Sequence, residues 1–267
     1  MRALAPLLAL AACATPADPD EAGLEGLDGK ADSITGIPTK RRVMTHVPCP
    51  EGDAKAKVAF FDADSTLRVS KSGSVTANTK TDVNVLPFAA REIARLADEG
   101  YVIAVVSNQG GVSSGQQTFA TAEGGLAYAV KQLARLGGKV DYFDFADKYD
   151  NYRKPNIGMA ELLDSKLETK CGAGIDYAQS FMVGDSGYKK DVDGPHPDGR
   201  PADDFSNSDR LFAENLGVPF HEPTDFFGWR EYDVFNIASQ AELEALLDVI
   251  EPVDVDEATK NREVNGL

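Results

Sequence analysis

Short hydrophobic runs that each end on a polar residue define the strands of the predicted fold. Residues 58–61 form an apolar run that is followed by Asp62, and residues 101–106 form a second run that is followed by Ser107. Continuous apolar runs of this length are typical of strands that are buried on both faces of a sheet. Further strands are predicted at residues 140–145, 180–183 and 218–220.

Helical periodicity occupies the stretches between these strands. Residues 88–99 place Ala89, Ile93 and Leu96 on one face, and Gly100 ends this predicted helix. Strands that alternate with helices predict an α/β fold, a three-layer Rossmann-like parallel sheet with right-handed crossovers. In such a sheet the functional site lies at the carboxyl ends of the strands. Further helices are predicted at residues 118–136, 157–168, 208–216 and 239–250.

The chain divides into four predicted segments. The first two are a signal and lipobox segment at residues 1–13 and a flexible tether at residues 14–56. The tether is rich in Ala, Pro, Asp, Glu and Gly and has little apolar periodicity, which is typical of a segment without a core of its own. A folded domain at residues 57–252 and an acidic tail at residues 253–267 complete the chain.

The N-terminus has the pattern of an export signal. An apolar run at residues 3–12 follows Arg2 and is too short to span a bilayer. Residues 10–13, Leu-Ala-Ala-Cys, resemble the lipobox of bacterial lipoproteins. That resemblance implies lipidation at Cys13 and an exported protein that touches the membrane only through its lipid anchor. A wrongly assigned start would instead leave the protein in the cytoplasm.

Charge and cysteine content narrow the range of partners. The 267-residue chain carries a formal net charge of −16, so its surface repels polyanions, and a nucleic-acid substrate would need a local basic patch. With three cysteines, three histidines and no Cys-x-x-Cys pair, a structural zinc site is not expected. In an oxidising compartment Cys49 and Cys171 could pair, which the sequence alone does not decide.

The first candidate motif follows the first predicted strand. Asp62 and Asp64 stand two residues apart, and clustered carboxylates repel each other unless a divalent cation lies between them. One such pair is by itself more typical of a solvated turn. The whole stretch at residues 62–67, Asp-Ala-Asp-Ser-Thr-Leu, resembles the signature of haloacid dehalogenase-type phosphatases.

Three later motifs occur in the order of the same superfamily. They are Ser107-Asn108 after the second strand, Arg153-Lys154-Pro155 before a helix, and Gly184-Asp185 after the fourth strand. The resemblance implies that Asp62 is the covalent nucleophile and that Asp64 is the general acid and base. It further implies that Ser107, Asn108 and Lys154 bind the phosphoryl oxygens. Mg²⁺ would be held by Asp62, by the backbone carbonyl of Asp64 and by Asp185.

A longer similarity narrows the class of phosphatase. Residues 204–220 and 226–229, together with residues 153–159, resemble the phosphatase domain of polynucleotide kinase 3′-phosphatases over residues 57–230. This resemblance implies removal of 3′-phosphate from DNA or polynucleotide ends. The chain lacks Gly-x-x-x-x-Gly-Lys-Ser/Thr, so neither kinase activity nor ATP binding is expected. Asp209 is the candidate for a further metal-site acid, and Asp191 and Asp204 compete for that role.

The region that would carry a cap domain is short. Only residues 68–87 lie between the first motif and the next helix, and this minimal cap predicts an open crevice. A monomer with such a crevice could admit a nucleic-acid end, or a small phosphomonoester such as a sugar phosphate, histidinol phosphate or nucleotide. A basic rim is expected from Arg68, Arg153, Lys189 and Lys190, with Lys71, Lys80 and Arg200 as further candidates.

Two other interpretations stay open at this point. The acidic charge favours a small-molecule phosphatase of the same fold over a polynucleotide enzyme. A non-catalytic surface lipoprotein would have lost catalytic side chains, whereas Asp62, Asp64, Ser107, Lys154 and Asp185 are all present. Aromatic residues near the later motifs are expected in the core more than as base-stacking platforms. They are Phe205, Phe212, Phe226, Phe227 and Trp229.

Overall fold

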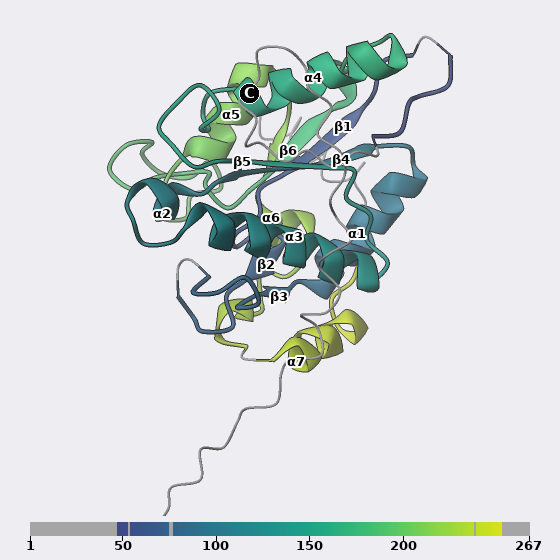
Figure 1. Ribbon diagram of the computed structural model, residues 1–267. Coiled ribbons are helices and arrows are strands. Elements are labelled where there is room, and N and C mark those ends of the chain that lie inside the picture. The colour runs from purple at the N-terminus through teal and green to yellow at the C-terminus, as the bar shows by residue number, and fades with distance from the viewer. Residues whose placement is uncertain (1–46, 53, 75–76, 238, 253–267) are drawn as a thin grey trace, which may run out of the picture.

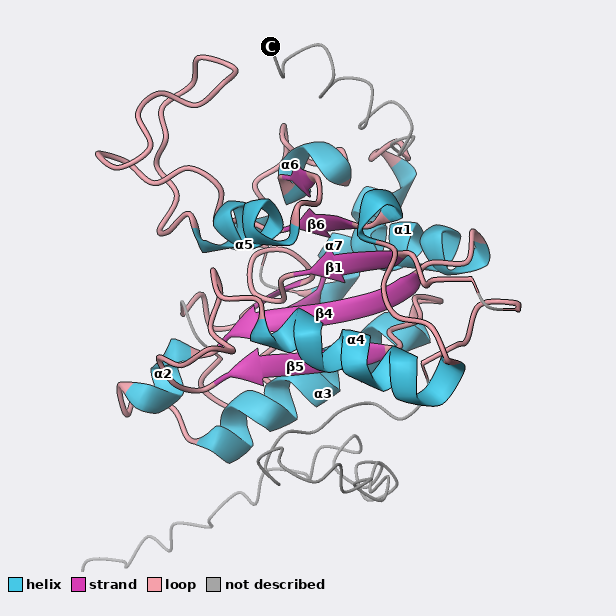
Figure 2. Cartoon of the chain, turned by 90° about the horizontal axis from the view of Figure 1, so that it is seen from above, coloured by secondary structure: helices cyan, strands magenta, loops and turns pink. Residues whose placement is uncertain are grey.

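The computed structural model describes residues 47–252 except 53, 75–76 and 238, and its centre is a five-stranded parallel sheet (Figures 1 and 2). The strand order is β5-β4-β1-β6-β7, and every neighbouring pair is parallel, so the predicted α/β fold is confirmed. These strands are β1 (Val58–Phe61), β4 (Val102–Asn108), β5 (Tyr142–Ala146), β6 (Phe181–Val183) and β7 (Phe220–His221).

Helices cover both faces of this sheet. The helices are α1 (Pro87–Asp98), α2 (Gly110–Ser113), α3 (Phe119–Arg135), α4 (Gly158–Cys171), α5 (Ser208–Leu216), α6 (Pro223–Phe226) and α7 (Gln240–Ala245). Helices α4 and α5 lie on one face, and α1 and α3 lie on the other (Figure 1). Short 3₁₀ helices cover Tyr177–Gln179, Val234–Asn236 and Leu246–Asp248.

The alternation of side chains along β1 divides the core into two layers. Val58 and Phe60 pack with residues of α4 and α5, whereas Ala59 and Phe61 pack with residues of α1, α3 and the C-terminal segment. All four β1 side chains are buried, which explains the uninterrupted hydrophobic run. Two layers of helices around one buried sheet are the three-layer arrangement that the sequence predicts.

Two local features differ from the sequence-based expectation. The helix predicted at residues 239–250 ends at Ala245 and continues as a 3₁₀ turn, although Ser239 forms the N-terminal capping box with Glu242. Helices α2 and α6 were not predicted, because each has four residues and cannot show helical periodicity. In the short cap, β2 (Arg68–Val69) and β3 (Asn84–Val85) form a two-stranded antiparallel sheet.

The folded region begins before the predicted boundary at Lys57. Val47 is buried in the core beside α4, and its carbonyl accepts a hydrogen bond of 2.7 Å from the Lys170 ammonium. Ala56 forms a parallel bridge with Ile175. The predicted tether therefore extends too far, because these residues find partners that are distant in sequence. The remainder of the tether, the segment 1–13 with Cys13, and the tail 253–267 lie outside the described residues.

A disulfide fixes this early segment to α4. Cys49 and Cys171 are bonded at a sequence separation of 122. A covalent link over such a long loop restricts the unfolded chain strongly.

Among the residues that the structure describes, no helix has both the length and the apolarity to cross a bilayer.

Reducing this disulfide is expected to lower the free energy of unfolding by about 2–4 kcal/mol, because the reduced chain gains conformational entropy when it unfolds. Urea denaturation with and without a thiol reductant measures the difference. The double variant Cys49→Ser, Cys171→Ser is the control, and the reductant should not change its midpoint. Equal midpoints for the oxidised and reduced wild-type protein would contradict the prediction.

Candidate active site

The candidate site lies where the order of the strands reverses. The chain runs from β1 to β4 and β5 on one side, and then crosses to β6 and β7 on the other side of β1. Ligands of parallel sheets bind at the carboxyl ends of the strands beside such a point. Asp62 follows β1, Ser107 lies near the end of β4, and Asp185 follows β6. Tertiary structure thus brings three of the predicted residues to one edge of the sheet.

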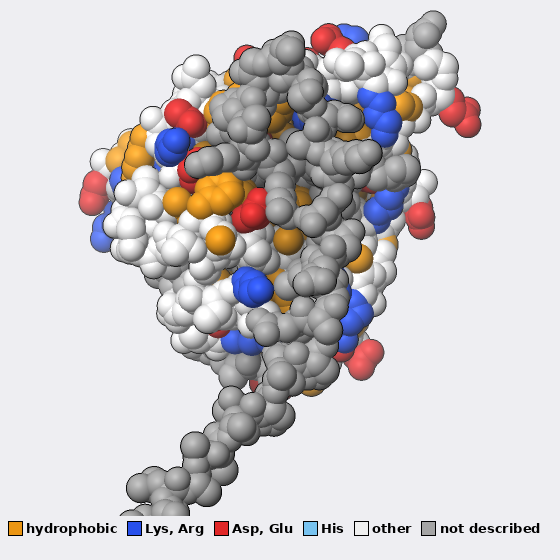
Figure 3. All heavy atoms as spheres, in the orientation of Figure 1, with side chains coloured by type: hydrophobic (Ala, Val, Ile, Leu, Met, Phe, Trp, Pro, Cys, Tyr) orange, Lys and Arg blue, Asp and Glu red, His pale blue; other side chains and the backbone are white. Residues whose placement is uncertain are grey.

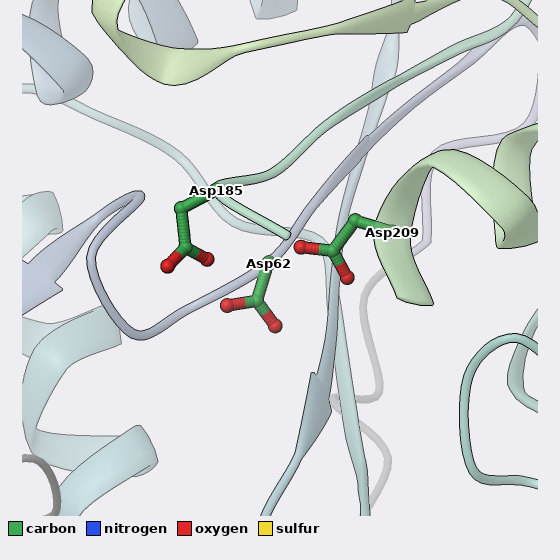
Figure 4. Close-up of side chains that lie close together, drawn as sticks. All are labelled: Asp62, Asp185 and Asp209. Atoms are coloured by element: carbon green, nitrogen blue, oxygen red, sulfur yellow. The ribbon is translucent and has the colours of Figure 1, made fainter. Parts of the chain in front are cut away.

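Three carboxylates form the centre of the site (Figure 4). One oxygen from each of Asp62, Asp185 and Asp209 lies within 4.8 Å of the others. Asp209 enters the cluster from the first turn of α5 and is 1% exposed. Burial raises the pKa of Asp62 to about 7 and raises that of Asp185 well above its usual range. Buried carboxylate oxygens at this spacing fit the ligand preference of a hard divalent cation.

Lys154 lies against the same carboxylates. Its ammonium is 2.6 Å from Asp62 Oδ1 and 2.7 Å from Asp209 Oδ1, and the side chain is almost fully buried. Burial alone would lower the pKa of Lys154, but the carboxylates of Asp209 and Asp62 outweigh it and raise that pKa. A buried cation between two acids offsets part of their repulsion and would attract a phosphate dianion.

Gly184 allows the close approach of Asp209. A Cβ atom at Gly184 would lie 2.3 Å from Asp209 Oδ2, so any other residue there would displace the Asp209 side chain. The same carboxylate accepts a hydrogen bond of 3.2 Å from the Ser186 amide. These contacts single out Asp209 from its competitors, because Asp204 binds the amides of Gly187 and Tyr188 and Asp191 is exposed. The sequence signal for this contact is the glycine that immediately precedes Asp185.

The side-chain carboxamide of Asn108 binds the backbone of Lys154. Its Oδ1 accepts from the Lys154 amide at 2.9 Å, and its Nδ2 donates to the Lys154 carbonyl at 2.9 Å. The carboxamide of Asn108 therefore positions Lys154, and phosphate binding by Asn108 stays a prediction. Sequence spacing could not show this, because the two residues are 46 positions apart.

Replacing Asn108 with alanine is expected to lower kcat toward an aryl phosphate about 10-fold, because a displaced Lys154 no longer lies against Asp62. Steady-state kinetics measures this loss. Asn156→Ala is the matched control, since its side chain makes one hydrogen bond, to the Asp150 carbonyl, in the same loop. Equal kcat values for the two variants would show that the Asn108 contact does not position Lys154.

Asp64 is held by two side chains that the sequence did not assign to it. Arg68 donates to Asp64 Oδ1 at 2.8 Å, and Gln109 Nε2 donates to Asp64 Oδ2 at 2.6 Å. The same Gln109 nitrogen lies 2.9 Å from the Ser107 hydroxyl oxygen and donates to it. Gln109 directly follows the Ser107-Asn108 motif, and that adjacency is the only sequence signal for its role. Asp64 keeps an open side, with 36% of its side chain exposed.

The predicted basic rim is only partly supported. Arg68 is 3% exposed and paired with Asp64, so it belongs to the interior of the site and not to its rim. Arg153 stacks on the Tyr149 ring at 4.4 Å, while Lys189 and Lys190 are exposed. On the face shown in Figure 3, the described basic side chains are scattered among acidic ones. Arg68 was misjudged because an Asp four residues earlier, at position 64, captures its guanidinium.

Comparisons with known proteins agree with this geometry. The family model described as polynucleotide kinase 3 phosphatase matches residues 57–227. An uncharacterised 20.8 kDa protein of Autographa californica nuclear polyhedrosis virus is 31% identical over 176 residues, which are 66% of this chain and 88% of the viral protein. A protein of Acanthamoeba polyphaga mimivirus, provisionally described as a bifunctional polynucleotide phosphatase/kinase, is 33% identical over 185 residues. That match spans 64% of this chain and 41% of the mimivirus protein.

A solved structure shows the same fold. It is that of a protein of Mesorhizobium loti, provisionally described as a HAD-like phosphatase, with 17% identity and a TM-score of 0.50. The similarity covers 67% of this chain and 76% of the other. At this identity the similarity concerns the fold.

Proposed function

Because the chain belongs to the polynucleotide kinase 3 phosphatase family, a group of haloacid dehalogenase-type phosphatases, we propose that it removes 3′-phosphate from polynucleotide ends. The observation that carries this proposal is the position of Asp62, which lies 2.6 Å from the Lys154 ammonium and beside Asp185 and Asp209. An anionic nucleophile can meet a phosphate dianion only where positive charge offsets their repulsion. The site offers one buried cation and three oxygen ligands for another.

The proposed reaction has two steps. A carboxylate oxygen of Asp62 forms a bond to phosphorus while the bond from phosphorus to the substrate oxygen breaks, and Asp64 gives that oxygen a proton. Water then attacks the aspartyl-phosphate, Asp64 takes the proton from water, and inorganic phosphate and the Asp62 carboxylate are released. Lys154 and the Ser107 hydroxyl bind phosphoryl oxygens in both steps.

Asp62, Asp185 and Asp209 would hold Mg²⁺, with the Asp64 carbonyl as a further ligand. The ion would supply charge that shields Asp62 from the phosphate dianion. Arg68 and Gln109 orient the Asp64 carboxyl toward its task, because together they engage both of its oxygens. The chain's own residues thus bind phosphate, hold the nucleophile and move one proton.

The small cap supports a large substrate. Between the first motif and α1, the described residues form the β2–β3 pair and no separate domain, so a polymer end could reach Asp62. The net charge of −16 is the observation that favours the second candidate, a small-molecule phosphatase. Long-range repulsion of a polyanion would make oligonucleotide hydrolysis faster at higher salt, whereas a neutral or monoanionic substrate would be affected less.

The test measures phosphate release from three substrates: one oligonucleotide with a 3′-phosphate, the same oligonucleotide with a 5′-phosphate, and a sugar phosphate. Each is assayed with Mg²⁺ and with a chelator. Phosphate release from the 3′-phosphorylated end alone supports the proposal. Faster phosphate release from the sugar phosphate would instead support the second candidate, a small-molecule phosphatase. Adding ATP and a 5′-hydroxyl oligonucleotide tests the prediction that the chain has no kinase activity.

We also propose that the protein is exported and carries a lipid at Cys13. The Cys49–Cys171 disulfide supports this proposal, because such bonds persist mainly in oxidising compartments. Extracellular nucleic acid would then be the accessible polymer. Detergent-phase partitioning of the native protein and of Cys13→Ala tests the anchor, and equal partitioning of the two would exclude it.

A further inference from the structure

A pocket of about 280 Å³ opens beside the catalytic carboxylates. Ser65 and Asp185 form its border with the active site, and Asp185 is one of the three acids of Figure 4. Ser65 directly follows Asp64, the residue that would protonate the leaving group. The part of a substrate that carries the phosphate must therefore lie at the mouth of this pocket. Its volume is at the lower end for small-molecule sites, which suits one small ring system.

Aromatic side chains also line the pocket. Phe205 is 91% exposed and Phe235 is 49% exposed, and both line the pocket. Trp229 also lines the pocket but is buried, and its ring contacts that of Phe235 edge-on at 5.7 Å between centroids. Of the five aromatic residues expected in the core, Phe205 is the exception, since the other four are buried. Exposed aromatic faces at a pocket mouth are stacking surfaces for flat ligands.

Two polar atoms on lining residues lack partners within the part of the chain that the structure describes. They are the Trp229 indole nitrogen Nε1, which donates, and the Thr224 hydroxyl Oγ1, which donates or accepts. Buried polar atoms without hydrogen bonds are rare and costly in folded proteins. Both atoms are shielded from solvent, so the exposed rings and not these atoms form the face that a ligand meets.

The charge of the lining limits what such a ligand can be. Arg200 is already paired with Glu222 and Asp198. Burial and the neighbouring Arg200 lower the pKa of His196, which disfavours the charged form of its imidazole. A pocket with this balance repels a phosphodiester and accepts a neutral group. The remaining charged lining residues are acidic, namely Asp185, Asp203, Asp204 and Glu222.

We propose that this pocket binds the nucleobase of the 3′-terminal nucleotide, with the base stacked on Phe205. This inference rests on the proposed polynucleotide function and adds the determinant that separates a nucleotide from a sugar phosphate. The remaining polymer, which is charged, extends away from the acidic wall.

The first experiment measures binding without catalysis. Trp229 is the only tryptophan of the chain and lines the pocket, so its fluorescence reports on ligands there. Thymidine should change the emission in a saturable way, and deoxyribose should not. Phe205→Ala should weaken thymidine binding by about 10-fold, from the loss of one stack. Val192→Ala is the control, since Val192 is 63% exposed and does not line the pocket.

The second experiment compares 3′-phosphorylated oligonucleotides with and without a base on the terminal nucleotide. The ratio of their kcat/KM values should fall about 10-fold in Phe205→Ala and stay constant in Val192→Ala. The pocket assignment is overturned if thymidine leaves the fluorescence unchanged, or if the ratio of kcat/KM values is the same in Phe205→Ala as in the wild type. In either case, hydrolysis of the 3′-phosphorylated oligonucleotide would still support the proposed function. Saturable thymidine binding without hydrolysis of the oligonucleotide would keep the pocket assignment and overturn the proposed function.

Discussion

Asp62→Asn is expected to lower phosphate release from any phosphomonoester by on the order of 10³-fold or more, because the amide cannot form the phosphoryl bond. The substitution preserves the shape of a side chain that is 7% exposed and removes its charge from a cluster of acids. The folded structure should therefore survive. Loss of activity with an unchanged circular dichroism spectrum is the expected result, measured with an aryl phosphate and with a 3′-phosphorylated oligonucleotide.

The matched control is Asp191→Asn, since Asp191 is exposed and lies outside the cluster of acids. Its rate should stay within about two-fold of the wild type, because surface substitutions of this kind change little. If Asp62→Asn kept a tenth or more of the activity, a covalent aspartyl-phosphate at this residue would be excluded. A rate that falls equally in both variants would indicate a general effect of charge.

Lys154→Met is expected to destabilise the fold and to abolish catalysis together. The ammonium lies 2.6 Å from Asp62 and 2.7 Å from Asp209, so its removal leaves two buried carboxylates without their cation. Breaking a buried ion pair on one side costs about 3–5 kcal/mol. Urea denaturation in the presence of a chelator measures that cost. Lys189→Met is the control, because Lys189 is exposed.

Magnesium separates the two roles of Lys154. If the three carboxylates bind the ion, its addition should restore part of the stability of Lys154→Met, because the ion replaces the lost positive charge. Phosphatase activity should not return, since the phosphate loses a partner. A variant as stable as the wild type under chelation would contradict the picture of Lys154 as the counter-ion of Asp62 and Asp209.

The sequence predicts the sheet and the strand-end residues because both depend on local patterns. Each central strand is buried on both faces, so its hydrophobic run is continuous and ends where Asp62, Ser107 or Asp185 meets the crevice. Helices of more than two turns show their periodicity for the same reason, whereas α2 and α6 are too short to do so. The position of the crevice then follows from the strand order.

The partners that orient the site are less predictable, because they join residues that are distant in sequence. Asn108 binds the Lys154 backbone across 46 positions, and Gln109 reaches Asp64 across 45. Arg68 illustrates the opposite error, in which a local pair was overlooked and a buried residue was placed on the rim. Phe205 was expected in the core by composition, and only its surroundings reveal an exposed ring.

The segment that begins at Val47 joins the folded domain at the C-terminal end of α4, far from the crevice. Helix α4 starts four residues after Lys154 and ends at Cys171, so the disulfide lies about 20 Å from the crevice, at the opposite end of the helix. A force applied to the chain before Val47 is transmitted through the Cys49–Cys171 bond to α4 before it reaches β1 or Asp62. If the chain were attached to a surface ahead of Val47, the disulfide end of α4 would be the nearer end of that helix along the chain, and the crevice lies at its other end.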